Sequence, residues 1–438
     1  MKIRIISIIT LIAMIFSVAA MGVLSSSAAV APKENKWYVS KGSINPDTYD
    51  YTFAFVGDIQ SITEMDYFTG TNYVDTLFSW IANNVETKKI QHVFTLGDLT
   101  EWSSENDNHL SYATGKPESQ ASGNAEWNIV KNAIQKLDGV VPYSVVRGNH
   151  DDYKIDDYFN YEAYTKNFNG FYDGSMEPAG NAKASAWAQR YYQDGSITNS
   201  YRLVTINGTK FIFITLDFNP TPGVMAWVDK LLTDYADYNA IITLHSYAQH
   251  DYDEDRKQYY GRPLYPNEVQ TVIVSEYNNN ISPRVLWNNC FSKHENIVMT
   301  VSGHIGVEDP FYFETTGENG NVVANFLVNP QSYDKKIQPT GMVFLMHFKN
   351  GETTIRTEYY STNLERYKLD NNKSYTLNLK VGEVPSVDDN TDTTETTTTV
   401  SAAPEKKGCK GSVSLVSIAL VPAFAGVSLA KMRKKKEN

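Results

Sequence analysis

The stretch Tyr143-Ser-Val-Val-Arg-Gly-Asn-His-Asp151 joins a short apolar segment to a turn that carries several polar side chains. An apolar run of this length, ended by glycine, is typical of a buried strand. Gly148 allows the chain to turn directly after the strand. The three residues that follow it carry oxygen and nitrogen atoms that can bind a metal or transfer a proton. The sequence therefore predicts a functional cluster at the end of this strand.

Four other predicted strands end in the same way. They are residues 51–56 before Asp58 and Gln60, 92–96 before Asp98, 240–244 before His245, and 297–301 before His304. Ligands of α/β proteins bind beyond the carboxyl ends of the strands, and carboxylate, amide and imidazole groups suit divalent metals. Each residue alone has an ordinary explanation, such as a helix or turn cap for Asp58. Five strand ends in series favour one shared metal site.

The rest of the body alternates short apolar runs with amphipathic segments. Apolar spacing predicts helices over residues 74–85, 127–137, 224–235 and 285–294. Residues 202–206 and 210–216 are predicted to form a hairpin around Asn207-Gly208. Residues 322–328, 342–348 and 353–360 are further predicted strands. Strands that alternate with helices indicate an α/β layered fold.

In their order along the chain, these motifs resemble those of the calcineurin-like metallophosphoesterase superfamily. The family pattern is a DxH block, GDxx(D/N/E), GNH(D/E), a single histidine after a strand, and GHxH. The chain shows Asp58-Ile-Gln60, Gly97-Asp98, Gly148-Asn149-His150-Asp151, His245 and Gly303-His304, within about residues 50–310. The resemblance implies an α/β fold, a four-layer α/β/β/α sandwich of two mixed sheets. In that fold, the late strands between 322 and 360 would complete the second sheet.

The resemblance also implies two divalent metal ions, with Zn, Fe or Mn expected ahead of Ca. The implied ligands are Asp98 as the bridge, Asn149, His245 and His304 on one ion, and Asp58 and Gln60 on the other. His150 would protonate the leaving oxygen, and Asp151 would orient the His150 imidazole. The implied reaction is hydrolysis of a phosphate mono- or diester by a metal-activated hydroxide.

Two positions depart from the family pattern. Gln60 stands where the family usually has histidine, and Gly306 stands where the last histidine of GHxH belongs. We therefore expect one metal site to be weak or vacant, or to recruit Glu308 or Asp309. These departures keep a second function open, namely a surface binding or adhesion protein on a catalytically impaired phosphoesterase scaffold. Metal content separates the two functions, because only the enzyme needs both ions.

The two ends of the chain predict export and anchoring. Residues 1–31 combine a basic start with an apolar run and small residues, which is typical of a signal peptide. Residues 412–430 carry no charge and precede a basic tail at 431–438, which favours a transmembrane anchor with a cytoplasmic tail. Between this anchor and a metallophosphoesterase domain at 32–384, the threonine-rich residues 385–411 are expected to form a stalk.

This arrangement resembles the C-terminal sorting signals of Gram-positive surface proteins. No LPxTG-like pentapeptide is present in the sequence, and Gly408-Cys409 offers only a weak signal for processing. We therefore expect an exported ectodomain on the cell surface of a Gram-positive bacterium.

The net charge of −11 conceals an uneven distribution. Residues 32–405 contain 29 basic and 49 acidic side chains, which makes the body a poor partner for a nucleic-acid backbone. The expected partners are a small phosphate ester or a phosphate ester at the cell surface, and the membrane through the anchor. Arg147 is interpreted either as a contact for the substrate phosphate or as the partner of a neighbouring acid.

Overall fold

The computed structural model describes residues 38–39, 42–101, 120–151, 189–192, 198–218, 220–264, 281–331 and 339–382. The chain divides into two units, residues 1–385 and 386–438, and every described residue belongs to the first. The predicted signal peptide, stalk, anchor and basic tail lie outside the described residues. Within the described ranges, no helix combines the length and apolar character that a membrane crossing requires.

The first sheet is mixed and surrounds β2 (Tyr51–Val56). Its order is β1 (Tyr38–Val39), β16 (Arg366–Lys368), β15 (Thr354–Ser361), β14 (Met342–Phe348), β2, β3 (Ile90–Thr95) and β4 (Tyr143–Ser144), with β17 (Ser374–Thr376) beside β15. β2, β3 and β4 run parallel, whereas β14 runs antiparallel to β2. The three parallel strands therefore direct their carboxyl ends to the same edge.

The second sheet is also mixed. Its order is β12 (Phe311–Thr316), β13 (Val322–Leu327), β11 (Ile297–Ser302), β8 (Asn239–Leu244), β7 (Thr209–Leu216), β6 (Ser200–Ile206) and β5 (Gln189–Tyr191). β13, β11, β8 and β7 are parallel neighbours. The predicted hairpin is present as β6 and β7, and both turn residues, Asn207 and Gly208, adopt positive φ angles of 48° and 82°. Such angles are typical of a tight Asn-Gly hairpin turn.

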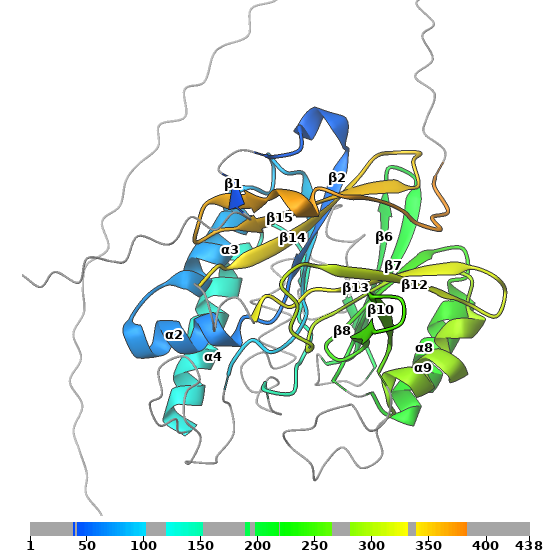
Figure 1. The fold of residues 1–438 in the computed structure, drawn as a ribbon, viewed down its shortest axis with the longest axis horizontal. Helices are drawn as coiled ribbons and strands as arrows, with labels where there is room; N and C mark the ends of the chain where they lie inside the picture. The colour runs from blue at the N-terminus through cyan, green and yellow to red at the C-terminus, as the bar shows by residue number, and fades with distance from the viewer. Residues whose placement is uncertain are drawn as a thin grey trace, which may run out of the picture. The chain divides into compact units, whose positions relative to one another are not determined.

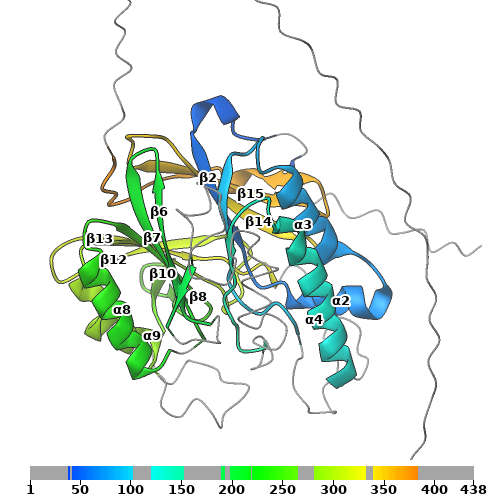
Figure 2. The same ribbon diagram turned by 180° about the vertical axis from the view of Figure 1, so that it is seen from behind.

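Helices cover the outer face of each sheet (Figures 1 and 2). α2 (Gln60–Thr69), α3 (Tyr73–Asn83) and α4 (Gln120–Ile134) pack on the first sheet through a cluster of buried apolar side chains. α8 (Pro222–Asp234) and α9 (Pro283–Asn289) pack on the second sheet through another such cluster. The predicted four-layer α/β/β/α sandwich of two mixed sheets is therefore confirmed.

An aromatic interlayer, the buried side chains between the two sheets, forms the central part of the core. Phe53 of β2 meets Phe213 of β7 edge to face, with ring centroids 5.1 Å apart and an interplanar angle of 83°. Phe94 of β3 contacts the same Phe213 ring at 5.1 Å and 80°. Edge-to-face pairs of this kind add specific geometry to the burial of apolar area. They fix how the two sheets lie against each other.

Three predictions about the elements need correction. The late strands do not all complete the second sheet, because only β13 joins it, whereas β14 and β15 extend the first sheet beside β2. The hydrophobic pattern indicates that these strands are buried, but it does not indicate which of the two sheets they join. The strand expected over 140–146 pairs with β3 only at Tyr143–Ser144. The helix expected over 285–294 ends at Asn289, because the backbone of Cys290 is not helical, and η4 (Phe291–Lys293) follows.

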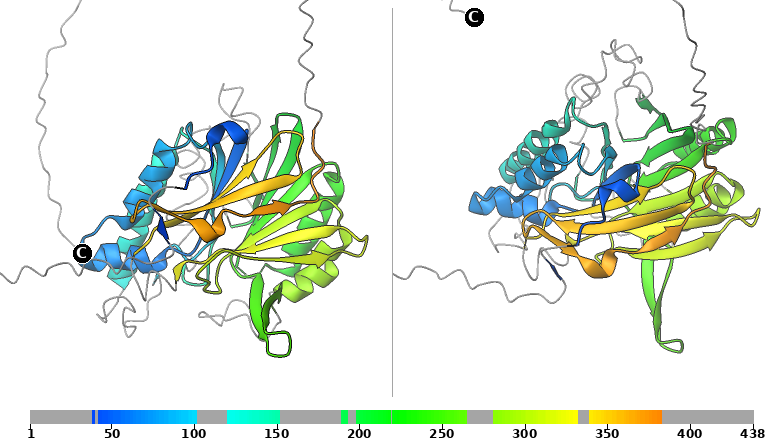
Figure 3. Two further views of the ribbon diagram at one scale, coloured as in Figure 1. Left: turned by 45° about the horizontal axis from the view of Figure 1, so that its top comes forward. Right: turned by 90° about the horizontal axis from the view of Figure 1, so that it is seen from above.

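One helix and a hairpin outside both sheets are among the elements that were not predicted. α2 begins directly at Gln60, and its buried face is largely polar, so apolar spacing does not reveal it. β9 (Ala248–Asp253) and β10 (Gln258–Pro263) form an antiparallel hairpin that projects from the sandwich (Figure 3). Most of its residues are polar or aromatic and solvent-accessible, so they lack the apolar alternation of a core strand.

Asp138 lies in the turn after η2 (Gln135–Leu137), where it accepts a hydrogen bond of 2.9 Å from the Tyr143 hydroxyl. Burial raises the pKa of Asp138 to about 7, and this hydrogen bond opposes the rise. The folded protein therefore keeps a proton that the unfolded chain releases near pH 4. It follows that the free energy of unfolding falls as the pH rises from about 4 to about 7.

We expect Asp138→Asn to raise the free energy of unfolding by about 1 kcal/mol at pH 8 and to change it little at pH 4. The amide can still accept the hydrogen bond from Tyr143, and it has no proton to lose. Urea unfolding of both proteins at the two pH values measures the difference. An effect of the same size at both pH values would contradict the assignment of the shifted pKa to Asp138.

Candidate metal centre

Strand ends from both sheets meet at one edge of the sandwich. The first sheet contributes Asp58 after β2, Asp98 after β3 and Asn149 after β4, and the second contributes His245 after β8, His304 after β11 and Asn329 after β13. Because these strands are parallel within each sheet, their carboxyl ends lie at the same edge. The structure thus brings the residues singled out in the sequence together and adds Asn329.

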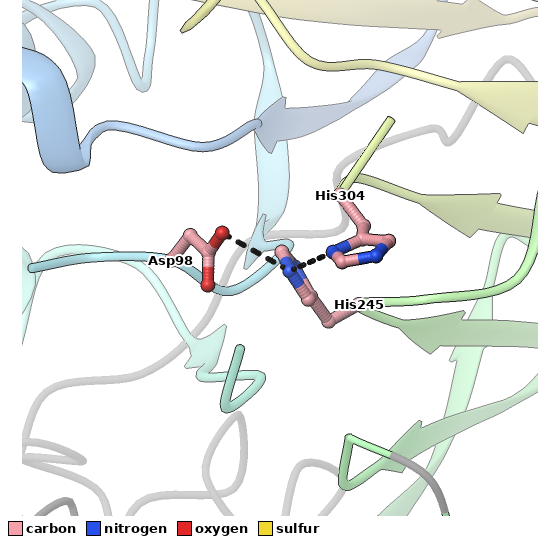
Figure 4. Close-up of side chains that lie close together, drawn as sticks. All are labelled: Asp98, His245 and His304. Carbon is pink, nitrogen blue, oxygen red and sulfur yellow. Dashed lines mark hydrogen bonds and ion pairs between the residues drawn. The ribbon is translucent and has the colours of Figure 1, made fainter. Parts of the chain in front are cut away.

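Four ligand atoms form the first group at this edge. His245 Nε2 lies 3.0 Å from Asn149 Oδ1 and 3.2 Å from both Asp98 Oδ2 and His304 Nδ1. His304 Nδ1 lies 2.8 Å from Asn149 Oδ1. Figure 4 shows that Asp98 and His304 approach His245 from opposite sides. We call these four side chains the histidine group.

Nitrogen and oxygen atoms of the histidine group that can offer lone pairs face one another. The ring of His245 donates its Nδ1–H to the Leu96 carbonyl oxygen at 2.8 Å, so the neutral ring presents the Nε2 lone pair to the group. The oxygens of Asn149 and Asp98 are acceptors as well. A tetrahedral zinc site with bonds of about 2.0–2.1 Å has ligand atoms about 3.3 Å apart. The observed separations of 2.8–3.2 Å come close to this value, so the residues fit a divalent ion.

The electrostatics of the histidine group also favour a cation. Burial opposes protonation of His245, but the carboxylates of Asp98 and Asp58 outweigh it and raise the pKa of His245 to about 9. Burial and the neighbouring His245 lower the pKa of His304 to about 3. Burial alone would raise the pKa of Asp98, but the imidazoles of His245 and His150 hold it below its ordinary value. The group therefore attracts one positive charge and resists a second proton.

A second group of ligands, which we call the carboxylate–amide group, lies beside Asp98 and consists of Asp58 and Gln60. Both side chains are fully buried. Gln60 Nε2 donates to Asp98 Oδ2 at 3.1 Å, and Gln60 Oε1 is buried without a hydrogen-bond partner among the described residues. Burial raises the pKa of Asp58 well above its usual range. A buried amide oxygen next to two carboxyl groups fits a second divalent ion, with Asp98 between the two groups.

Asn329 is a functional candidate that the sequence did not reveal. It is fully buried, and its Nδ2 donates to Asp58 Oδ2 at 2.6 Å. Its Oδ1 accepts from the Gln331 amide at 2.9 Å, which fixes the orientation of the side chain. The residue follows a predicted strand, as the other candidates do, and this position is the signal that points to it. Asn329 therefore holds the Asp58 carboxylate in place.

Close backbone approaches shape the two groups. A Cβ atom on Gly148 would lie 2.2 Å from the Asp98 backbone nitrogen and Oδ1, and one on Gly303 would lie 2.0 Å from Asp58 Oδ1. Asp98 and His304 themselves adopt positive φ angles of 50° and 68°. Such angles are uncommon for residues with a side chain and are found at functional sites. Glycine is needed at 148 and 303 because the carboxylates occupy the space of a side chain.

His150 lies next to Asp98, but the group that orients its ring is not the predicted Asp151. The His150 amide donates to Asp98 Oδ1 at 3.0 Å, and the His150 Nδ1 lies 2.7 Å from the carbonyl oxygen of Glu101. A carbonyl can only accept, so Nδ1 carries the proton and Nε2 is the nitrogen that can exchange one. The backbone of Glu101 thus has the orienting role that the sequence resemblance assigned to Asp151.

Asp151 instead binds backbone amides of the two loops beside the site. Its Oδ1 accepts from the amides of Leu99 and Thr100 at 2.7 and 3.1 Å, and its Oδ2 accepts from the Gly148 amide at 2.7 Å. Burial and the neighbouring Asp98 raise the pKa of Asp151 to about 6. The carboxyl joins the turn after β3 to the turn after β4, which keeps Asp98 next to His150.

The structure does not place Asp309 as a replacement for the missing histidine at Gly306. The Asp309 carboxylate pairs with Lys368 and accepts from Asn371 Nδ2 at 2.7 Å, so it is engaged elsewhere. Glu308 is exposed. The expectation that one of these two carboxylates completes the carboxylate–amide group is therefore wrong for Asp309, and the structure gives no support for it at Glu308.

Arg147 forms a two-pronged ion pair with Asp217. Its Nε and Nη2 donate to the two carboxylate oxygens of Asp217 at 2.7 and 2.6 Å, and both side chains are largely buried. Of the two interpretations left open by the sequence, pairing with an acid is therefore the one observed. The pair joins the loop after β4 to the loop after β7, and so links the two sheets near the candidate metal centre.

Comparison with known proteins gives the following matches. The sequence model of the calcineurin-like phosphoesterase family matches residues 51–308, which is more than half of the chain. The Bacillus subtilis protein YvnB, described as uncharacterized, is 24% identical over 226 residues, and the match covers 50% of this chain and 14% of YvnB. The chain thus spans a small part of that relative.

Two solved structures show a weak overall likeness. A dimetal phosphatase from Danio rerio has a TM-score of 0.40 and 12% identity, and the match covers 75% of this chain and 99% of that chain. GAP50, the anchor in the inner membrane complex of Plasmodium, has a TM-score of 0.36 and 12% identity, with 76% and 90% covered.

Proposed function

Because the chain belongs to the calcineurin-like phosphoesterase family, we propose that it hydrolyses phosphate mono- or diesters with the help of two divalent metal ions. The observation that carries this proposal is the histidine group, in which four potential ligand atoms from both sheets lie within hydrogen-bond distance of a neighbour in the group. A divalent cation satisfies all four of these atoms at once.

The two groups of side chains divide the work of holding the ions. Asn149, His245 and His304 would hold one ion, Asp58 and Gln60 the other, and Asp98 would contact both. When bound, a pair of divalent ions lowers the pKa of a water molecule to about 7 and neutralises the charge on the phosphoryl oxygens. Zn, Fe or Mn match the nitrogen and oxygen ligands better than Ca does.

The protein's own contribution to bond breaking comes from His150. The Glu101 carbonyl holds its Nδ1–H, so Nε2 is the atom that gives a proton to the leaving oxygen when the imidazole is charged. The His150 amide donates to Asp98 Oδ1 at 3.0 Å, which holds this residue beside the metal-binding groups. Arg147 is held by Asp217 and thus serves to position the loop that carries His150.

A panel of phosphate esters tests the proposed activity. The purified full chain is stripped of metal, then assayed against alkyl and aryl mono- and diesters with Mn, Fe, Zn and Ca added back separately. We expect hydrolysis with the transition metals and with zinc, and weaker hydrolysis with calcium. If no ester in the panel is hydrolysed by protein that has bound both ions, the proposed function is wrong.

Gly306 supports a second candidate function, a surface binding or adhesion protein on an impaired phosphoesterase scaffold. The carboxylate–amide group has Asp58 and Gln60 but no histidine from position 306, so its ion is expected to bind more weakly than the ion of the histidine group. Elemental analysis of the full chain separates the functions. Two ions per chain that Asp98→Asn removes favour the enzyme, and a chain without such ions at saturating metal favours the binding protein.

We also propose that the enzyme acts outside the cell, held at the surface of a Gram-positive bacterium. The signal-like residues 1–31 and the apolar residues 412–430 with their basic tail support this location. The substrate would then be a phosphate ester in solution or on the cell surface. Protease added to intact cells should remove the domain, and protection of the domain until the cells are lysed would count against the proposal.

A further inference from the structure

A second cluster of metal-binding side chains lies on the outer side of the second sheet, among the helices that cover it. Asp229 belongs to α8, Cys290 is the residue after α9, and His294 is the residue after η4. One ligand atom from each of the three side chains lies within 4.8 Å of the other two. None of them belongs to the candidate metal centre. The cluster joins the two helical segments that cover this sheet.

The three side chains differ in their exposure to solvent. His294 Nε2 lies 2.8 Å from Asp229 Oδ1, and the exposed fractions of these two side chains are 12% and 52%. Cys290 is fully buried, with its sulfur 4.0 Å from the carbonyl oxygen of Met225. The imidazole and the carboxylate are thus reachable from solvent, and the thiol lies behind them.

We propose that Asp229, Cys290 and His294 bind one zinc ion, which links α8 to the α9–η4 segment. A thiolate, an imidazole and a carboxylate are the ligand types that zinc prefers, and a water molecule completes a tetrahedral site with three protein ligands. The mixture of one soft and two harder ligands favours zinc over calcium or magnesium, which take oxygen ligands only.

Binding requires a small movement and the loss of one proton. In a tetrahedral zinc site the sulfur and its nearest neighbours lie about 3.5 Å apart, and the three ligand atoms lie within 4.8 Å of one another, so each must close by at most about 1.3 Å. Rotation of the exposed Asp229 side chain supplies such a movement. Burial and the neighbouring Asp229 raise the pKa of the Cys290 thiol to about 12. The ion replaces the thiol proton, which leaves to solvent.

This site does not depend on the proposed phosphoesterase activity. The ligands of the candidate metal centre are oxygen and nitrogen atoms, so a bond from a metal to sulfur identifies the second site. The whole chain has two cysteines, and the second, Cys409, lies outside the described residues. A full chain that carries Cys409→Ser therefore has one thiol, and any thiolate bound to a metal must be that of Cys290.

Cobalt(II) provides the test, because a thiolate ligand gives cobalt a strong charge-transfer band in the near ultraviolet. We expect the Cys409→Ser full chain to show this band after titration with Co²⁺, and zinc to remove the band by displacing cobalt. Cys290→Ser in the same background should abolish the band while ester hydrolysis stays unchanged. A Cys409→Ser chain that shows no thiolate band at saturating Co²⁺ would overturn the proposal.

Two surface variants keep the test valid if Cys290→Ser fails to fold. Asp229→Asn and His294→Gln remove one ligand each at accessible positions, and each should weaken Co²⁺ binding at this site by about tenfold or more. Asp234→Asn is the matched control, because Asp234 lies on the same helix and pairs with Lys230 instead, so it should leave the affinity unchanged. Equal affinity in all three variants would show that the thiol binds cobalt without the cluster, which contradicts the assigned site.

Discussion

Asp98→Asn is expected to lower kcat/KM for phosphate-ester hydrolysis by about a thousandfold or more. The substitution keeps the size of the side chain but removes the negative charge between the two metal-binding groups. Asp98 Oδ2 lies 3.2 Å from His245 Nε2 and 3.1 Å from Gln60 Nε2. A neutral amide at this position binds a divalent ion far less well than a carboxylate does, so both ions should be weakened together.

Activity, metal content and thermal melting should be measured on the same preparation of Asp98→Asn. The melting temperature of the metal-free protein should fall, because the lowered pKa of Asp98 means that the folded protein stabilises this carboxylate, and an amide loses that stabilisation. Asp75→Asn is the matched control, since Asp75 lies on the exposed face of α3 and pairs with Lys136. Undiminished hydrolysis by Asp98→Asn with a normal melting curve would refute the role of Asp98.

The second large effect is expected at His150. His150→Gln should lower kcat by about a hundredfold to ten-thousandfold, the usual range for loss of a general acid. The loss should depend on the leaving group, because an alkoxide needs a proton and a nitrophenolate does not. We therefore expect a large effect on alkyl phosphate esters and a small one on nitrophenyl esters, with unchanged metal content.

Steady-state rates for a matched pair of alkyl and nitrophenyl esters provide the measurement. His250→Gln is the control, because His250 lies on β9 in the projecting hairpin and its ring contacts Tyr259 and Phe311 instead of the metal-binding groups. An equal loss for both esters would show that His150 acts on substrate binding or metal affinity and does not protonate the leaving oxygen.

Much of the fold could be predicted from sequence because its core strands are continuously apolar. β2, β8 and β11 are buried along their whole length, so they read as largely apolar runs with a metal-capable residue one or two positions after each. The sheet to which a strand belongs was harder to predict. β14 is as apolar as β13, yet it pairs with β2 in the other sheet. The apolar pattern of a strand does not tell which of two sheets it joins, because that depends on how the chain returns in three dimensions.

The candidate site was predictable where a strand end carries a distinctive residue and not elsewhere. Asn329 contacts Asp58 over a separation of 271 residues, and its position after a predicted strand is its one signal in the sequence, because asparagine before proline is also typical of an ordinary turn. The partner of His150 is a backbone carbonyl, and every residue has one. Resemblance to a family therefore suggested a carboxylate for that role, whereas the carboxylate of Asp151 binds three amides.

The aromatic interlayer has a consequence for the chemistry that lies beyond it. The histidine group takes Asp98 and Asn149 from one sheet and His245 and His304 from the other, so its ligand spacing depends on how far apart the sheets stand and how far one has slid along the other. The packed rings of Phe53, Phe94 and Phe213 set both the distance between the two sheets and their alignment along each other. A smaller side chain in place of one of these rings would let the two halves of the coordination shell slip out of register. Sites of altered metal affinity are therefore to be sought in this layer of phenylalanines, well away from any ligand.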